Sequence, residues 1–449
     1  MNIIKSIVKG FGFLTLGTAF GSCVFIVGVS VGFSHAEQEY FSTANQPNFQ
    51  DGVTSGQTQT NPFLKASLIF ERIVQNWAGG EVDVNEIIDN AIFGMMKNLD
   101  PHSSYQPPLE AEDLRISISG SFGGVGMEMT KNSVTKQIEV VTPMPNTPAH
   151  RAGIKPGDII THVDGEELPE DPNISDVADK IKGEIDTTVV LTIIRDGEEL
   201  EIPIVRETIR VSAVKHKMLE NNIGYISVSA FINDVSNDVN RAIGDLKTQA
   251  NNQQSNLKGI ILDLRNNPGG LLNEGINMTN AFVDEGSIVS TEGPQRNANQ
   301  HWYANEITTM VDDDTPIVVL INSGSASASE IVAGALHGLN RATLVGTKSY
   351  GKGSVQTVYP LFDGSSLRLT TAHYFVADHI PIHGIGLTPD VLVELPEEYL
   401  PLFDDVDPQV RASIDVILNG YNATCTYTVE LIEESAEGSY TLNKNCQAD

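Results

Sequence analysis

One segment constrains the fold of this chain more than any other: an apolar run that leads through a turn of small residues into a helix. Residues 316–321 read Pro-Ile-Val-Val-Leu-Ile, a continuous apolar stretch that predicts a strand buried on both faces. Gly324 and alternating serines follow, and residues 328–336 predict a helix of small side chains. A buried strand that passes directly into a helix is the unit of an α/β sheet, so we expect an α/β core.

The rest of the chain divides into segments of different pattern. Residues 63–99 carry apolar side chains at helical spacing, with Gly79 and Gly80 between two helices. A β-rich segment shows short strands at 125–130, 137–141, 159–163 and 189–195 and a helix at 174–182. Beyond Val211, strands at 223–229, 259–264, 316–321 and 342–345 alternate with helices at 235–246, after Gly270 and from Ala328. The acidic tail predicts a helix and a small β element.

We therefore divide the chain into six parts. They are an N-terminal signal segment (1–36), a flexible linker (37–60), a helical segment (61–111), a β-rich domain (112–206), the α/β core (207–395) and an acidic C-terminal extension (396–449).

The N-terminus predicts export. Lys5 and Lys9 precede residues 10–36, which contain no Asp, Glu, Lys or Arg. Such a run can span a bilayer with its lysines in the cytoplasm, which would anchor the chain on the periplasmic side of a bacterial inner membrane. Ser34-His-Ala36 also resembles a signal-peptide cleavage site, and cleavage would leave a free periplasmic protein. In either oxidising location, Cys425 and Cys446 are expected to form a disulfide.

Composition excludes some partners. The formal charge is −30, from 58 acidic and 28 basic residues, which argues against nucleic acid or anionic membrane surfaces as ligands. No metal-ligand spacing occurs among the ten histidines, so we expect neither a metal nor an organic cofactor.

The serine turn and a later lysine are the candidate chemistry. Ser327 would lie at a helix N-terminus, where free N–H groups stabilise negative charge, but a serine there can also be a simple helix cap. Lys352 stands between Gly351 and Gly353. If it is desolvated, its pKa falls and it can act as a base; if it is a solvated surface lysine, it cannot.

Residues 346–352 also match a phosphate-binding loop up to its last position. That position is Gly353, which lacks the hydroxyl that would hold Mg²⁺, so we reject a nucleotide site.

Two glycine-rich segments complete the candidate site. Asp263-Leu-Arg-Asn-Asn-Pro-Gly-Gly270 follows a strand, and it can supply a backbone oxyanion donor or simply a tight turn. Residues 122–127, Phe-Gly-Gly-Val-Gly-Met, can form a nest for a terminal carboxylate or a plain hairpin.

Together these motifs resemble the carboxy-terminal processing peptidases, or tail-specific proteases, which are serine-lysine endopeptidases with an inserted PDZ domain. The resemblance covers about residues 63–395. Its motifs lie at residues 99–105 (Leu-Asp-Pro-His-Ser-Ser-Tyr), 120–126, 149–158, 163–165, 262–272, 325–331 (Ser-Ala-Ser-Ala-Ser-Glu-Ile) and 351–356 (Gly-Lys-Gly-Ser-Val-Gln). It implies a crotonase-like or ClpP-like α/β protease core, preceded by the helical segment and interrupted by the PDZ domain.

The resemblance also implies the roles of single residues. Ser327 would be the nucleophile, Lys352 the general base and Gln356 the residue that positions the lysine, while Ser325 and Ser329 would be structural. The oxyanion donors would be the backbone N–H groups of Ala328 and of one glycine of the pair Gly269 and Gly270.

The PDZ domain would bind the exposed apolar C-terminus of a protein substrate as an added strand and would gate the protease core. The tail would lie beside residues 125–130, in contact with Gly124, Val125, Gly126 and Met127, with the helix near 174–182 as the other wall. A second copy of the chain or an adaptor protein is a further expected partner.

Three positions depart from the family pattern. Gly338 replaces an acidic residue, Lys182 replaces an arginine, and residues 376–380 replace a Thr-Pro-Ser-Gly-Arg turn. We expect a periplasmic serine endopeptidase that cleaves near C-terminal tails. The alternatives are a catalytically silent PDZ adaptor and a non-proteolytic acyl-transfer enzyme of the crotonase-like superfamily.

Overall fold

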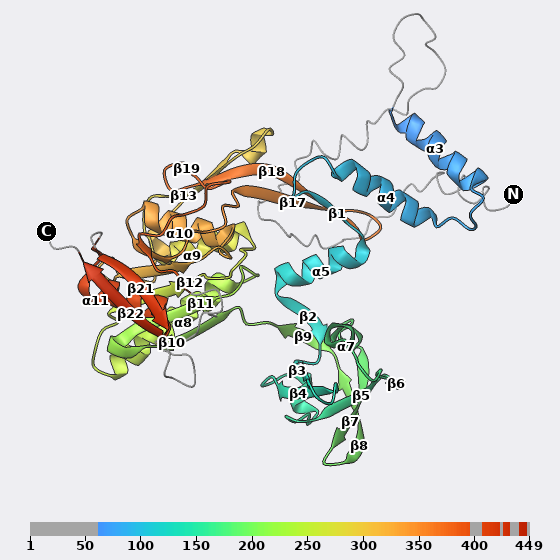
Figure 1. Cartoon of the computed structure of the whole chain (residues 1–449), viewed down its shortest axis with the longest axis horizontal. Helices are drawn as coiled ribbons and strands as arrows, with labels where there is room; N and C mark the ends of the chain where they lie inside the picture. The colour runs from blue at the N-terminus through green and yellow to red at the C-terminus, as the bar shows by residue number, and fades with distance from the viewer. Residues whose placement is uncertain (1–61, 396–405, 423–424, 432–439, 447–449) are drawn as a thin grey trace, which may run out of the picture. The chain divides into compact units, whose positions relative to one another are not determined.

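The computed structural model describes residues 62–395, 406–422, 425–431 and 440–446 (Figure 1). The predicted signal segment and linker lie outside these residues. Among the helices that are described, none is long and apolar enough to cross a membrane.

The central element is a six-stranded sheet in the order β10-β11-β12-β15-β16-β20. Its strands are β10 (Val214–Met218), β11 (Ile223–Val228), β12 (Gly259–Asp263), β15 (Ile317–Ile321), β16 (Ala342–Gly346) and β20 (Val391–Leu392). All neighbours from β11 to β20 are parallel, and β10 is antiparallel to β11. Every residue of β12 and β15 is buried, as the apolar run of 316–321 predicts. The α/β core is therefore confirmed.

Four helices accompany this sheet: α8 (Val235–Asn252), α9 (Leu272–Asn280), α10 (Ala328–Gly338) and α11 (Pro408–Asn419). The α11 side chains Val410 and Ile417 join a buried cluster with Ile261 and Val318 of the sheet. Helix α10 contacts α9, strand β16 and the second sheet. It starts directly after the serine turn, which connects β15 of the central sheet to α10.

A second six-stranded sheet carries the lysine segment and was not predicted from the sequence. It has the order β1-β18-β13-β14, with β17 and β19 also paired to β18. The strands are β1 (Ser104–Gln106), β13 (Ser287–Glu292), β14 (Gln300–Tyr303), β17 (Ser354–Pro360), β18 (Ser366–Val376) and β19 (Ile380–Pro381). Figure 1 shows β17 and β18 as a long ribbon with β1 beside it.

The β-rich segment is a domain around a sheet of order β3-β4-β5-β7-β8, with β6 (Glu166–Glu167) paired to β5. The strands are β3 (Met127–Lys131), β4 (Ile138–Pro143), β5 (Ile159–Val163), β7 (Thr188–Arg195) and β8 (Glu198–Val205); the helices are α6 (Pro148–Arg151) and α7 (Ile174–Ile181). The predicted strands and helix are confirmed, except that β3 begins at Met127. Strands β2 (Ser121–Gly124) and β9 (Glu207–Arg210) pair at the two ends of this segment, as an inserted domain requires.

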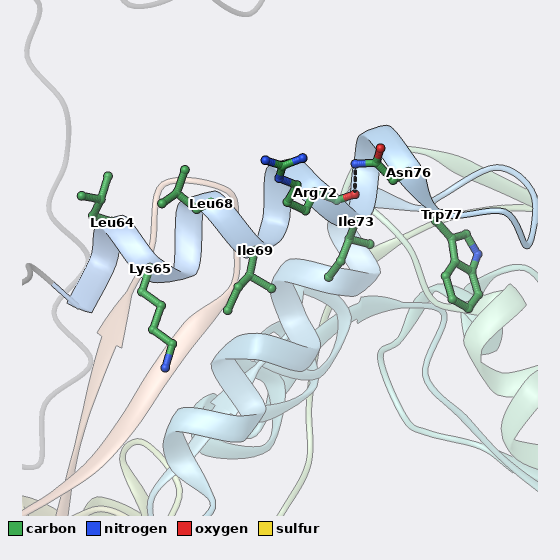
Figure 2. A pocket seen from close by; sticks show the side chains of 8 residues that line it. All are labelled: Leu64, Lys65, Leu68, Ile69, Arg72, Ile73, Asn76 and Trp77. Atoms are coloured by element: carbon green, nitrogen blue, oxygen red, sulfur yellow. Dashed lines mark hydrogen bonds between the residues drawn. The ribbon is translucent and has the colours of Figure 1, made fainter.

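The helical segment consists of α3 (Pro62–Asn76), α4 (Val84–Met96) and α5 (Pro108–Ser119). No residue of α4 is buried, but Tyr105 of β1 ties it to the second sheet by donating a 2.8 Å hydrogen bond to Asp89. A groove of about 660 Å³ runs along α3, where Ile69 and Ile73 share one side of the helix (Figure 2). Its lining residues are Leu64, Lys65, Leu68, Ile69, Arg72, Ile73, Asn76 and Trp77, so it contains none of the predicted catalytic residues.

The C-terminal extension folds onto the core. Arg265 of the segment after β12 is buried and bonds Asp407 at 3.0 Å and Gln409 at 2.8 Å, at the start of α11. Strands β21 (Cys425–Leu431) and β22 (Tyr440–Cys446) then form a hairpin. Its register sets Cys425 opposite Cys446, and Cys446 is disulfide-bonded.

Candidate active site

Three serines around the start of α10, Ser325, Ser327 and Ser329, differ in exposure and in hydrogen bonding. Ser325 and Ser329 are fully buried, and their hydroxyls donate to the carbonyls of Leu264 (2.7 Å) and Asn267 (2.9 Å). Ser327 is only half-buried. The hydroxyls of Ser325 and Ser329 are therefore committed to holding the turn, whereas Ser327 remains accessible to a substrate.

Ser327 has an unusual backbone, with φ 55° and ψ −116°. Non-glycine residues rarely adopt such angles, and they persist only where the surroundings enforce them. The backbone of Gly269 packs closely against Ser327: if position 269 carried a Cβ, that atom would lie only 2.7 Å from the Ser327 Cβ. Only glycine at position 269 lets the second glycine turn approach the serine this closely.

Lys352 lies just before β17, and its two flanking glycines permit close packing. A Cβ on Gly353 would lie 2.5 Å from the His383 amide, and one on Gly351 would lie 2.9 Å from the Gly386 amide. Lys352 is half-buried as a residue. Burial, with the nearby Arg368 guanidinium adding to it, lowers the pKa of Lys352 from its ordinary value, while Glu330 opposes the shift. A lowered pKa makes more of the neutral amine available near neutral pH.

Glu330 joins the serine turn to the lysine segment. It is fully buried, and its Oε2 accepts hydrogen bonds from the backbone amides of Ser327 (3.0 Å) and Lys352 (2.8 Å). Its Oε1 accepts from the Gly351 amide (2.7 Å) and the Ser349 hydroxyl (2.6 Å). One carboxylate thus fixes the backbones of both candidate catalytic residues.

Tyr374 of β18 makes a second link between the same two segments. Its phenol oxygen lies within hydrogen-bond distance of the carbonyl oxygens of Ser327 (3.1 Å) and Lys352. Burial and then the charge of Glu330 raise the pKa of Tyr374 well above its ordinary value, so the phenol remains a donor. A cleft of about 440 Å³ opens beside it, lined by Glu292, Gly293, His373, Tyr374, Phe375, Pro381, Ile382 and His383.

Gln356 lies on β17 and its side-chain amide is held from two sides. The Nε2 group donates to the hydroxyls of Ser354 (2.9 Å) and Thr370 (3.2 Å). No hydrogen bond among the described residues joins the Ser327 hydroxyl to the Lys352 amine. Catalytic hydrogen bonds are often long without substrate and shorten when the substrate binds.

The two glycines of the predicted oxyanion site differ. The Gly269 amide donates to Asn267 Oδ1 at 2.9 Å and is buried, whereas Gly270 is exposed and its amide has no acceptor within the described ranges. Gly270 is therefore the member of the pair that could bind an oxyanion. Ala328 has no exposed surface, so its amide is covered in this conformation.

The predicted tail-binding loop precedes β3. Gly124 and Val125 are buried, and the carbonyls of Val125 and Gly126 accept hydrogen bonds from the amides of Ala149 (2.8 Å) and Met144 (3.0 Å). The Val125 and Gly126 amides have no acceptor in the part of the chain that is described. Met127 begins β3, which is the terminal strand of its sheet and has α7 nearby.

Two of the departures from the family pattern contact each other. A Cβ on Gly338 would lie 2.5 Å from Ala377 Cβ and 3.3 Å from Ile380 Cδ1, so the altered 376–380 segment occupies the space that an acidic side chain at 338 would need. The third departure, Lys182, lies 5.6 Å from the ring centroid of Phe122, next to the tail-binding loop.

Glu330, Tyr374, Thr370 and Asp100 belong to the site but were not identified from the sequence. Glu330 stands three residues after Ser327, which is the spacing of a capping box, and this signal could have found it. Asp100 lies in the 99–105 motif and bonds His102 and Ser103 nearby, but nothing local reveals its contact with Thr370. Tyr374 and Thr370 have no local signal, because their partners are distant along the chain.

Comparisons with known proteins show the family to which the chain belongs. Residues 222–393 match the family model described as peptidase family S41, and residues 139–195 match a PDZ domain. The chain is 45% identical over 337 residues to a carboxy-terminal-processing protease of Bartonella bacilliformis, covering 74% of this chain and 75% of that protein. It is 38% identical over 316 residues to a probable CtpA-like serine protease of Staphylococcus aureus, covering 70% of this chain and 62% of that protein.

A solved structure of a photosystem II D1 C-terminal processing protease is also similar. It is 28% identical, with a TM-score of 0.43, and the match covers 77% of this chain and 96% of that one. The extent of identity to the Bartonella protein establishes the family: this chain belongs to peptidase family S41, with the carboxy-terminal-processing proteases, and carries a PDZ domain.

Proposed function

We propose that this protease is a serine endopeptidase that cleaves exported proteins near their C-terminal tails by a Ser327–Lys352 mechanism. The observation that supports it best is the Glu330 carboxylate, which binds the backbone amides of both residues. A nucleophile and its base must be held close together. Here one buried carboxylate fixes the backbones of a half-exposed serine and a half-buried lysine.

Whether residues 10–36 stay attached as an anchor is decided by the intact mass of the protein recovered from cells.

The chemistry would use only side chains and backbone of this chain. The neutral Lys352 amine takes the proton of the Ser327 hydroxyl as the oxygen attacks the substrate carbonyl. The Gly270 amide, with that of Ala328 once uncovered, would stabilise the oxyanion. The Lys352 ammonium then returns the proton to the leaving amine, which leaves an acyl-serine. Lys352 next takes a proton from water as the water oxygen attacks the acyl carbon. It then returns that proton to the departing Ser327 oxygen, and the acyl group leaves as a carboxylic acid, which ionises.

Incubation of the purified protein with a poorly folded protein that bears an apolar C-terminal tail tests this proposal. We expect the wild type to cut the substrate and Ser327→Ala to leave it intact, with products identified by mass spectrometry. Ser323→Ala is the matched control, because Ser323 is exposed in the same turn and should retain full activity.

Two other outcomes would contradict the proposal. Tail binding with no cleavage above the Ser327→Ala level would indicate a silent PDZ adaptor. Turnover of an ester or acyl-CoA without peptide cleavage would indicate an acyl-transfer enzyme.

We also propose that the PDZ domain binds the substrate's terminal carboxylate at the loop before β3. The free amides of Val125 and Gly126 and the open edge of β3 support this. Amidation of the C-terminus of a fluorescent apolar peptide should weaken its binding to the Ser327→Ala protein by about tenfold or more, since charge-assisted hydrogen bonds are lost. Fluorescence polarisation measures this, and N-terminal acetylation of the peptide is the control. Equal affinity of the amidated and free peptides would place the tail elsewhere.

A further inference from the structure

We propose that Thr370, itself held by Asp100, is a positioning residue that fixes the orientation of the Gln356 side-chain amide. This inference rests on the proposed function, in which Gln356 supports Lys352. It assigns a catalytic purpose to the connection between α4 and β1, because that connection supplies Asp100.

Asp100 is part-buried and surrounded by donors. Its Oδ1 accepts hydrogen bonds from the amides of His102 (2.9 Å) and Ser103 (3.1 Å) and from the Thr370 hydroxyl (2.9 Å). The Ser103 hydroxyl donates to Oδ2 and accepts from the Thr370 amide at 3.0 Å. Desolvation raises the pKa of Asp100, but these hydrogen bonds, that of the Ser103 hydroxyl foremost, outweigh it and hold the pKa below its ordinary value. At neutral pH the group is a carboxylate.

The charge of Asp100 sets the direction of every hydrogen bond that follows. A carboxylate can only accept, so the Thr370 hydroxyl must give its single proton to Asp100. The hydroxyl oxygen can then only accept from Gln356, 3.2 Å away, which must present its NH₂ group. Asp100 therefore selects one of the two orientations of an amide that it does not touch.

The second hydrogen of the same NH₂ group is also used. It reaches the hydroxyl of Ser354 at 2.9 Å, which shows that Ser354 and Gln356 lie on the same side of β17. With both hydrogens engaged, the remaining polar atom is Oε1, an acceptor. In the proposed role of Gln356, this oxygen accepts a hydrogen bond from the Lys352 ammonium, whereas a reversed amide would present only hydrogens to it.

The activity test removes only the hydroxyl. We expect Thr370→Val to lower kcat about tenfold while KM stays within about twofold, and Thr370→Ser to retain wild-type kcat. The matched control is Thr371→Val, because Thr371 is equally half-buried on β18 and its hydroxyl contacts Thr357 at 2.7 Å rather than Gln356. In the double variant Gln356→Ala/Thr370→Val, kcat should be no lower than in Gln356→Ala alone. An undiminished kcat in Thr370→Val, or additive losses in the double variant, would overturn the inference.

A second readout does not require activity. In the Ser327→Ala background, an NMR titration of the Lys352 Cε signal should show its midpoint moving to lower pH in Thr370→Val by about half a unit, because an acceptor of the ammonium is lost. Arg368, Glu330 and His102, which also act on Lys352 or face it, are unchanged in this variant. Thr371→Val should not move the midpoint. An unmoved midpoint in Thr370→Val refutes the positioning role, whereas a wild type that cuts no faster than Ser327→Ala refutes the proposed function.

Discussion

Lys352→Arg should abolish peptide cleavage as completely as Ser327→Ala, a loss of at least about 10³-fold in kcat/KM. The substitution keeps the positive charge, but a guanidinium does not give up a proton near neutral pH and so cannot act as the base. The planar fork also has to occupy a half-buried site bordered by two glycines that already contact residues 383–386. Cleavage of the tailed substrate, followed by gel or mass spectrometry, measures the effect.

The matched control for this variant is Lys348→Arg, since Lys348 lies in the same loop but is exposed. It should cut at the wild-type rate.

The pH dependence of cleavage gives an independent check of the base. Because only the neutral amine can accept the serine proton, wild-type kcat/KM should rise with pH and reach a plateau above the lowered pKa of Lys352. Substantial cleavage by Lys352→Arg, or the same pH profile in both proteins, would mean that another group takes the proton.

The sequence predicted the central strands of the α/β core most clearly, because their residues are uniformly buried. Strands β12 and β15 are buried at every position, so their apolar runs were unambiguous. The sheet of β13, β17 and β18 was missed because β17 and β18 are only partly buried and mix Ser, Thr, Gln and His with apolar residues. Strand β13 is buried at five of its six positions, but it reads Ser-Ile-Val-Ser-Thr-Glu, which is not a continuous apolar run. Its pairing is also distant along the chain, as between Ser104 of β1 and Arg368 of β18. No local pattern reports such a contact.

The residues of the candidate site also divide into those that the sequence motifs indicate and those that only the folded structure brings together. The family motifs predict Ser327, Lys352 and Gln356 as the catalytic residues, but they do not choose between Gly269 and Gly270 as oxyanion donors. The preference for Gly270 rests on the Asn267 side chain, which accepts from the Gly269 amide, whereas Gly270 is an exposed residue whose amide has no acceptor among the described residues. Likewise, the hydrogen bond of Asp100 to Thr370 joins residues that only the folded β1–β18 pairing brings together.

We expect a substitution at Glu330 to lower both the stability of the site and its catalytic activity, because Glu330 holds the backbones of Ser327 and Lys352. Each of its oxygens accepts two hydrogen bonds, Oε2 from the amides of Ser327 and Lys352, and Oε1 from the Gly351 amide and the Ser349 hydroxyl. In Glu330→Gln, one oxygen becomes an NH₂ group that faces donors. At least one backbone amide then loses its acceptor in a fully buried place, at about 1–3 kcal/mol for each orphaned group.

We expect Glu330→Gln to lower the free energy of unfolding by about 3 kcal/mol and kcat/KM by at least about 100-fold. The activity loss follows because the strained backbone of Ser327 and the segment that carries Lys352 are no longer fixed to one group. Thermal unfolding and substrate cleavage, both measured well below the melting temperature of the variant, report the two effects separately.

Glu274→Gln separates damage to the site from damage to the fold. Glu274 is also a buried acceptor, bonding the amide (3.0 Å) and the hydroxyl (2.7 Å) of Ser236 at the start of α8, and it touches neither Ser327 nor Lys352 through any hydrogen bond among the described residues. We expect it to cost similar stability but to change kcat/KM less than about threefold. If Glu330→Gln lost no more activity than Glu274→Gln at equal distance below their melting temperatures, Glu330 would be a core acceptor only, and the link between nucleophile and base would have to come from Tyr374.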